Sequence, residues 1–189
     1  EALLDLFQPR ELRTIYNVIA RLPGRGPGLG VAGSHRDAWV RGAHDSGSGT
    51  ALLIRAAEHL GLRARAGWQA EHTLVIGLWD AEEFGLIGST EWGEAHSREL
   101  SLHGQAYVNA DAAVSGPSFG ASGTPGMLGV LRGVLERTSA LDPEQGTLWD
   151  QWSRSSTGGE PRLALPGSGS DFAVFLHHLS LPVLDVGFS

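Results

Sequence analysis

The chain has 189 residues, a formal net charge of −7 at pH 7 and no cysteine. This length is typical of one domain that buries a core of its own, and the negative charge argues against nucleic acid or an anionic membrane surface as a partner. Without cysteine there are no disulfides or thiolate ligands, so any metal would be bound by oxygen and imidazole. No apolar stretch reaches the length of a membrane span.

The first half of the chain alternates segments of strand and helix character. The β-branched residues of 13–21 and the short apolar run 29–33 predict two strands, joined by a turn rich in Pro and Gly. Leu53, Ala57 and Leu60 recur at helical spacing and predict a helix over about 50–62. The apolar run 72–79 predicts a core strand.

The second half continues the alternation. We expect helices over 86–99, 127–139 and 171–179, strands over 105–109 and 181–186, and a long surface loop over 142–166, which is rich in Gly, Ser and Pro. In the first of these helices Ile87, Trp92 and Ala95 are the candidate buried residues. Trp39 and Trp79 are also predicted to lie in the core.

This alternation of strands and helices predicts an α/β sandwich with a mostly parallel sheet, in one domain that spans residues 1–189. In such sheets ligands bind beyond the carboxyl ends of the strands. Candidate site residues should therefore be sought where each predicted strand ends.

Two adjacent carboxylates, Glu82 and Glu83, follow the end of the core strand. Buried carboxylates are costly unless something neutralises them, and metal ions would do so. The other predicted strand ends and the loop before the first helix supply further candidates, which are His35, Asp37, Asp45 and Asp111. Their convergence on one edge of the sheet would form a two-metal hydrolase site.

The residue types suit different roles in such a site. A pair of metal ions about 3.5–4 Å apart needs a bridging carboxylate, and Asp45 is placed for this just ahead of a helix. His35 offers a neutral imidazole nitrogen, whose ring Asp37 would orient. Glu82 need not bind metal when Glu83 does, so it is free to act as a general base. The alternatives are that His35 is a satisfied polar residue at a strand end and that Asp37 caps a turn.

Five segments carry a resemblance to a known family. They are His35-Arg-Asp-Ala-Trp39, the loop through Asp45, Trp79-Asp-Ala-Glu-Glu-Phe-Gly85 with its continuation to Trp92, Tyr107-Val-Asn-Ala-Asp111, and Gly167-Ser-Gly-Ser-Asp171. Together they resemble the zinc peptidase domain of the glutamate carboxypeptidase II family, which also contains the transferrin receptor ectodomain. The resemblance runs from about residue 13 to about residue 186.

The resemblance implies a three-layer, zinc-exopeptidase-like sandwich with two zinc ions. His35 and Asp111 would bind one zinc, Asp45 would bridge, Glu83 would bind the other, and Glu82 would be the proton shuttle. The segment Ser168, Gly169 and Ser170 would line the substrate pocket. The family also implies a possible homodimer and favours an extracytoplasmic location.

The chain departs from the family pattern in two places. The histidine that completes the second zinc site lies after the last strand in the family and has no counterpart here, so we expect the domain to be truncated at its C-terminus and excised from a longer protein, with zinc partial or absent and activity weak or lost. The glutamate-selective members carry an arginine patch where this chain has Leu184-Asp-Val-Gly187. This difference favours a general aminopeptidase or dipeptidase over an enzyme for acidic substrates.

The leading hypothesis is therefore a zinc-dependent exopeptidase, aminopeptidase or glutamate carboxypeptidase-like, that hydrolyses peptide bonds with a metal-bound hydroxide. One alternative is a non-catalytic binding module of the transferrin receptor type. Another is an amidohydrolase or deacylase that acts on N-acyl amino acids at the same two-metal site.

Overall fold

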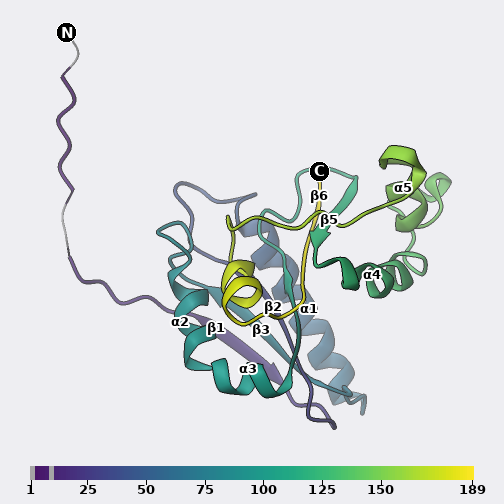
Figure 1. Cartoon of the computed structure of the whole chain (residues 1–189), viewed down its shortest axis with the longest axis horizontal. Coiled ribbons are helices and arrows are strands. Elements are labelled where there is room, and N and C mark those ends of the chain that lie inside the picture. Colours follow the sequence, from purple (N-terminus) through teal and green to yellow (C-terminus); the bar gives the residue numbers. More distant parts are fainter. Residues whose placement is uncertain (1–2, 9–10) are drawn as a thin grey trace.

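The computed structural model describes residues 3–8 and 11–189, and this part of the chain forms a sheet of six strands in the order β1-β3-β2-β4-β6-β5 (Figure 1). The strands are β1 Val18–Leu22, β2 Leu29–His35, β3 Thr73–Trp79, β4 Gly104–Asn109, β5 Phe119–Gly123 and β6 Val183–Phe188. The central four are parallel, and β1 and β5 pair antiparallel at the two edges. The predicted mostly parallel mixed sheet is confirmed.

Helices cover both faces of this sheet. They are α1 Gly47–Arg65, α2 Ile87–Ala95, α3 Ser97–His103, α4 Leu128–Leu135, α5 Leu148–Ser155 and the π-helix η4 Val174–His178, with short 3₁₀ turns η1 Pro125–Met127, η2 Pro143–Gln145 and η3 Thr157–Gly159. Leu53 of α1 lies against Ile76 and Leu78 of β3 on one face. On the other face Val75 and Trp79 of β3 pack with α2, α3 and η4. Because side chains alternate along a strand, β3 serves both layers, and the fold is a three-layer α/β sandwich.

A cluster of aromatic side chains forms the centre of the core. Trp79 lies 5.2 Å from Trp92, and Tyr107 stacks on Phe175 at 3.9 Å between ring centroids. The Trp79 Nε1–H donates to the Tyr107 hydroxyl at 3.0 Å, so both polar atoms are satisfied although both side chains are fully buried. Gly33 makes this contact possible, because a Cβ there would lie 2.3 Å from each of the two atoms.

A second hydrophobic cluster lies beyond the β5–β6 edge, where α4 and α5 pack (Figure 1). Phe119 meets Trp152 edge to face at 5.5 Å between ring centroids, and Leu148 is buried beside them. The prediction of a surface loop over 142–166 was therefore wrong in part. Thr147 and Asp150 form a capping box at the start of α5. The helix is stable despite its many polar residues because Leu148 and Trp152 are buried on one face.

Several boundaries and burial predictions also differ from the structure. The first strand begins at Val18 rather than at residue 13, and the expected helix over 86–99 is two helices that meet at His96. Ile87 and Ala95 are exposed, whereas Leu100 is buried. Trp39 is 65% exposed and packs on Phe84, which is itself exposed, so it is not a core residue. The expected helix over 127–139 ends at Leu135.

Strand β5 was not predicted at all. Its sequence, Phe119-Gly-Ala-Ser-Gly123, has no β-branched residue and no apolar alternation. Its strand conformation comes from antiparallel pairing with β6, and so from tertiary structure. In the described part of the chain, no helix is both long and apolar enough to cross a membrane.

The contact between Trp79 and Tyr107 gives a test of the core. Tyr107→Phe removes the acceptor of a buried indole N–H, and leaving a buried donor unsatisfied costs about 1–3 kcal/mol in the free energy of unfolding. Tyr16→Phe is the matched control, because Tyr16 is largely exposed, and it should cost less than about 0.5 kcal/mol. Urea unfolding of both variants measures the difference, and equal stabilities would contradict the role of the Tyr107 hydroxyl.

Candidate metal centre

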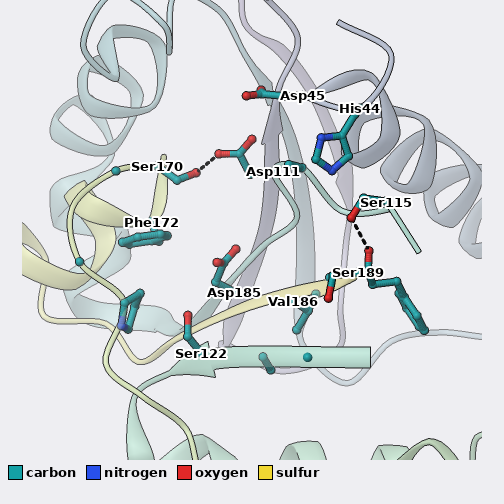
Figure 2. Close-up of a pocket in the computed structure, with 18 residues that line it drawn as sticks. His44, Asp45, Asp111, Ser115, Ser122, Ser170, Phe172, Asp185, Val186 and Ser189 are labelled. Carbon is teal, nitrogen blue, oxygen red and sulfur yellow. Dashed lines mark hydrogen bonds between the residues drawn. The ribbon is translucent and has the colours of Figure 1, made fainter. Parts of the chain in front are cut away.

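The predicted site residues converge at the carboxyl ends of three neighbouring parallel strands. His35 is the last residue of β2, Glu82 and Glu83 lie in the turn after β3, and Asp111 follows β4. The strand register aligns these ends, because His35 pairs with Trp79. Asp45 comes from the loop before α1 and lies on the same side of a cavity as Asp111 (Figure 2).

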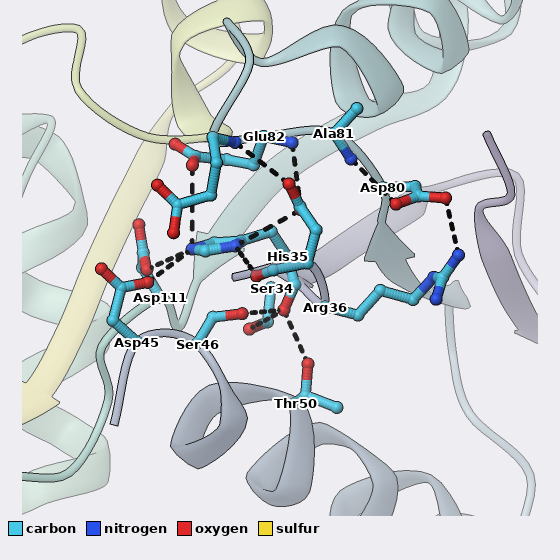
Figure 3. Close-up of polar contacts among 12 residues, drawn as sticks. Ser34, His35, Arg36, Asp45, Ser46, Thr50, Asp80, Ala81, Glu82 and Asp111 are labelled. Atoms are coloured by element: carbon cyan, nitrogen blue, oxygen red, sulfur yellow. Dashed lines mark hydrogen bonds and ion pairs between the residues drawn. The ribbon is translucent and has the colours of Figure 1, made fainter. Parts of the chain in front are cut away.

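His35 is the centre of the cluster and is only 1% exposed. Its Nε2 lies 2.8 Å from Asp111 Oδ1, 3.0 Å from Asp45 Oδ1 and 3.8 Å from Glu82 Oε2 (Figure 3). Its Nδ1 donates to the backbone carbonyl of Asp37 at 3.0 Å. Since a carbonyl can only accept, the proton stays on Nδ1, and Nε2 is the nitrogen available to a metal.

The backbone of His35 is fixed as firmly as its ring. The hydroxyls of Ser46 and Thr50 both donate to the His35 carbonyl, the latter at 2.7 Å. These contacts join the end of β2 to the start of α1. The segment Ser46-Gly-Ser-Gly49 thereby positions Asp45 relative to the imidazole.

Asp37 braces the turn that carries the two glutamates. Its carboxylate accepts hydrogen bonds from the backbone N–H of Glu82 at 3.1 Å and of Glu83 at 3.2 Å. Its Oδ1 is also 3.6 Å from His35 Nδ1. Asp37 therefore contacts both the imidazole and the turn, through its carbonyl and its carboxylate respectively.

Without a bound cation, the cluster carries more negative charge than its single imidazole can offset. Burial raises the pKa of Glu82 to about 7, and the nearby charges of Asp111, Glu83 and Asp37 add to this effect while His35 opposes it. Burial alone would lower the pKa of His35, but the hydrogen bond to Asp111 and the surrounding carboxylates raise it to about 10. The pKa of Asp111 is lowered despite its burial, because His35 and Ser170 donate to it.

The side chains fit a metal by chemistry and by spacing. Two groups of ligand atoms lie within 4.8 Å of one another: His35 with Asp45 and Glu83, and His35 with Glu82 and Asp111. One imidazole and several carboxylates form a donor set that zinc accepts. The structure thus brings together all four predicted ligands, together with Glu82 and Asp37.

A chain of hydrogen bonds connects this cluster to the core, and the sequence analysis did not find it. The Tyr107 hydroxyl donates to Asn109 Oδ1 at 3.0 Å, Asn109 Nδ2 donates to Ser170 Oγ at 2.9 Å, and Ser170 Oγ donates to Asp111 Oδ2 at 2.6 Å. Tyr107, Asn109 and Asp111 alternate along β4 and its end. That period of two was a signal available in the sequence.

The three residues predicted to line the substrate pocket have different positions. Gly169 and Ser170 line a cavity of about 630 Å³ beside the cluster, whereas Ser168 is exposed and is not among its lining residues. Ser170 is buried and bonded to Asp111, so it supports a candidate ligand as well as lining the cavity.

Asp171 ends the segment Gly167–Asp171, and the sequence did not predict its burial beside the cluster. It is 1% exposed, and neither carboxylate oxygen has a hydrogen-bond partner among the described residues. Burial raises its pKa to about 7, and the charges of Glu82 and Asp111 add to this effect, while the nearby Ser89 hydroxyl and the charge of His35 oppose it. A buried carboxylate of this kind destabilises the fold when it is ionised.

Comparison with known proteins agrees with this geometry. Residues 17–187 match the model of peptidase family M28. The chain is 42% identical over 158 residues to "Probable glutamate carboxypeptidase LAMP1" of Arabidopsis thaliana, which covers 84% of this chain and 23% of the relative. It is 35% identical over 189 residues to "Aminopeptidase NAALADL1" of Mus musculus, which covers 95% of this chain and 25% of the relative.

Among solved structures, a zinc aminopeptidase from Bacillus subtilis has the same fold, with a TM-score of 0.59 and 20% identity over 92% of this chain and 40% of that one. The fold is that of a zinc-aminopeptidase-like α/β domain. The chain belongs to peptidase family M28. It spans about a quarter of the length of the curated relatives it matches.

The hydrogen bond from Ser170 to Asp111 predicts an effect on metal affinity. Ser170→Ala should weaken zinc binding about 10–100-fold, because groups that orient a ligand contribute to this extent. Ser168→Ala is the matched control, since this serine is exposed and should leave the affinity unchanged. Calorimetric titration of both variants with zinc provides the measurement, and equal affinities would remove Ser170 from the site.

The burial of Asp171 predicts a dependence of stability on pH. The folded pKa of about 7 lies above the ordinary value of this carboxyl, so the folded protein loses stability as the pH rises from about 4 to about 7. Asp171→Asn has no proton to lose, so its stability relative to the wild type should rise over that range by about 2–4 kcal/mol.

Metal-free protein is required for this comparison, and urea unfolding at several pH values gives the free energies. Asp5→Asn removes an exposed carboxylate instead and is the control. A stability difference between Asp171→Asn and the wild type that does not change with pH would show that Asp171 is not held in a destabilising site.

Proposed function

We propose that this chain is the metal-binding part of a zinc-dependent exopeptidase that hydrolyses peptide bonds with two zinc ions. One observation carries the proposal: His35 Nε2 lies within 3.8 Å of carboxylates from three separate segments, namely Asp45, Glu82 and Asp111. Relatives named as an aminopeptidase and as a probable glutamate carboxypeptidase support the reaction class, and the zinc aminopeptidase with the same fold supports the metal.

In this proposal His35 and Asp111 would hold one zinc ion, Glu83 would hold the other, and Asp45 would serve both. Bound zinc would polarise the scissile carbonyl and lower the pKa of a water molecule. Glu82 lies beside these ligands, with its Oε2 3.8 Å from His35 Nε2, and would take up the proton of that water and release it to the leaving group. Asp37 keeps Glu82 and Glu83 in place through their backbone N–H groups.

The described residues offer a single histidine to the two proposed zinc ions. In the described residues both ligand groups share His35, and neither contains a second histidine. His177 belongs to neither group, and its Nε2 donates to the Gly167 carbonyl at 3.0 Å. We therefore propose that residues 1–189 alone bind a second zinc ion weakly and hydrolyse peptides slowly.

The candidate base and the candidate ligands are all present in one cluster, which argues against a purely non-catalytic module of the transferrin receptor type. The proposal of a peptide substrate over an N-acyl amino acid rests on the names of the relatives. Aminoacyl anilides and N-acyl amino acids, assayed side by side, separate a peptidase from a deacylase on the same site.

Glu82 and Glu83 provide the decisive test, because they are adjacent and chemically identical. In the natural protein that contains this chain, Glu82→Gln should lower kcat about 10²–10⁴-fold while zinc stays bound, since it removes a general base and no ligand. Glu83→Gln should instead lose zinc. Zinc content by atomic absorption and hydrolysis of a peptide panel are the two readouts. Loss of zinc in Glu82→Gln would show that Glu82 is a ligand, and no zinc in the wild type would refute the proposal.

A further inference from the structure

The cavity beside the candidate metal centre is lined by acidic side chains and, among the described residues, by no Lys or Arg. Its volume is about 630 Å³, which is in the range of small-molecule sites. Three aspartates line it: Asp45, Asp111 and Asp185 (Figure 2). Among the described residues that line it there is no Lys or Arg, and His44 is the one imidazole.

Asp185 differs from the other two aspartates because bound metal ions would not neutralise its charge. Asp45 and Asp111 belong to the two groups of candidate metal ligands, and Asp185 belongs to neither. Bound metal ions would therefore offset the charges of Asp45 and Asp111 and leave that of Asp185. No ion pair of Asp185 with a basic side chain occurs in the described part of the chain.

The carboxylate of Asp185 is also held in a fixed position. It stands on β6, where it pairs with Asn109 of β4 and with Ser122 of β5, so strands flank it on both sides. Asn109 Nδ2 donates to Asp185 Oδ1 at 2.9 Å. The same amide nitrogen donates to Ser170, which supports Asp111. Asp185 and the metal centre therefore share one anchor, and the distance between them is set by the sheet.

We propose that Asp185 binds a positively charged group of the substrate, either the α-ammonium of an unblocked peptide or a basic side chain. This inference rests on the proposed function and specifies the charge of the substrate group that the cavity accepts. A cation placed there gains a fixed carboxylate partner. A substrate with a carboxylate in the same position would meet Asp185 with no lining Lys or Arg to compensate, and would be rejected.

A purely structural role for Asp185 makes a different prediction. If the carboxylate only accepted the hydrogen bond from Asn109, its loss would disturb Ser170 and Asp111 and slow every substrate alike. If it binds a cation, its loss raises KM for cationic substrates and leaves kcat nearly unchanged. The pattern across substrates of different charge thus separates the two roles.

The kinetic test uses the natural protein that contains this chain, loaded with zinc. Leucine p-nitroanilide carries only an α-ammonium, N-acetyl-lysine p-nitroanilide carries only a side-chain ammonium, and N-acetyl-alanyl-glutamate carries only carboxylates. We expect Asp185→Asn to raise KM about 10–100-fold for the cationic substrate that the wild type cleaves, as loss of a charged hydrogen bond does. Which of the two anilides responds identifies the cationic group. Glu94→Gln removes an exposed carboxylate on α2 and should change neither constant.

A binding measurement decides the same question without hydrolysis. Calorimetry should show that the wild type binds leucinol or N-acetyl-cadaverine, which carry an ammonium and no scissile peptide bond at that end, at least about tenfold more tightly than N-acetyl-leucine, with Asp185→Asn losing this preference and Asp185→Glu keeping it. The wild-type comparison needs no variant, so it stands even if Asp185→Asn does not fold.

Two results would overturn the inference: a wild type that binds the carboxylate ligand as tightly as the cationic ones, or an Asp185→Asn variant that weakens all ligands equally. Failure of the proposed function is read separately. A protein without zinc or hydrolysis that still prefers the cationic ligands refutes the peptidase and retains the role of Asp185. A zinc peptidase that lacks this preference retains the proposed function and refutes the role of Asp185.

Discussion

The interaction on which the structure depends is the contact of one buried imidazole with carboxylates from three different segments. His35 is the only group among them that can offset their charge, and its raised pKa shows how strongly they act on it. A metal ion would replace that proton and take over the same task. The position of the imidazole follows from the sheet, because β2 ends at His35 between β3 and β4, and from Ser46 and Thr50, which hold its carbonyl.

The core and the candidate metal centre form one connected system. Hydrogen bonds run from Trp79 through Tyr107, Asn109 and Ser170 to Asp111, so the same side chains that satisfy buried polar groups also orient a candidate ligand. Asn109 extends this system to Asp185 in the cavity. Asp171 is the exception, since its buried carboxylate has no hydrogen-bond partner among the described residues and costs stability. Strain of this kind is commonly retained near functional sites.

The family of the chain and the substrate end that it binds rest on different observations. The family follows from the match over residues 17–187, and the similarity to a zinc aminopeptidase at 20% identity shows the fold. The named relatives include an aminopeptidase and a probable glutamate carboxypeptidase, so their names leave open which end of a peptide is bound. The charge of the cavity walls bears on that point directly, because Asp185 stands there without a basic partner.

The amino-acid sequence by itself determined the α/β class and predicted which side chains meet at the strand ends, because strand ends and paired acids are local patterns that alternation and residue type reveal. His35, Glu83 and Asp111 could be named for this reason. Tertiary structure alone decided what depends on a distant partner. Strand β5 exists only by pairing with β6, and α5 is helical where Gly, Ser and Pro indicated a loop, because Trp152 has a cluster to pack against. Trp39 lies outside the core, and Asp185 faces a cavity rather than a cation, since exposure and charge balance are set by residues far apart in the chain.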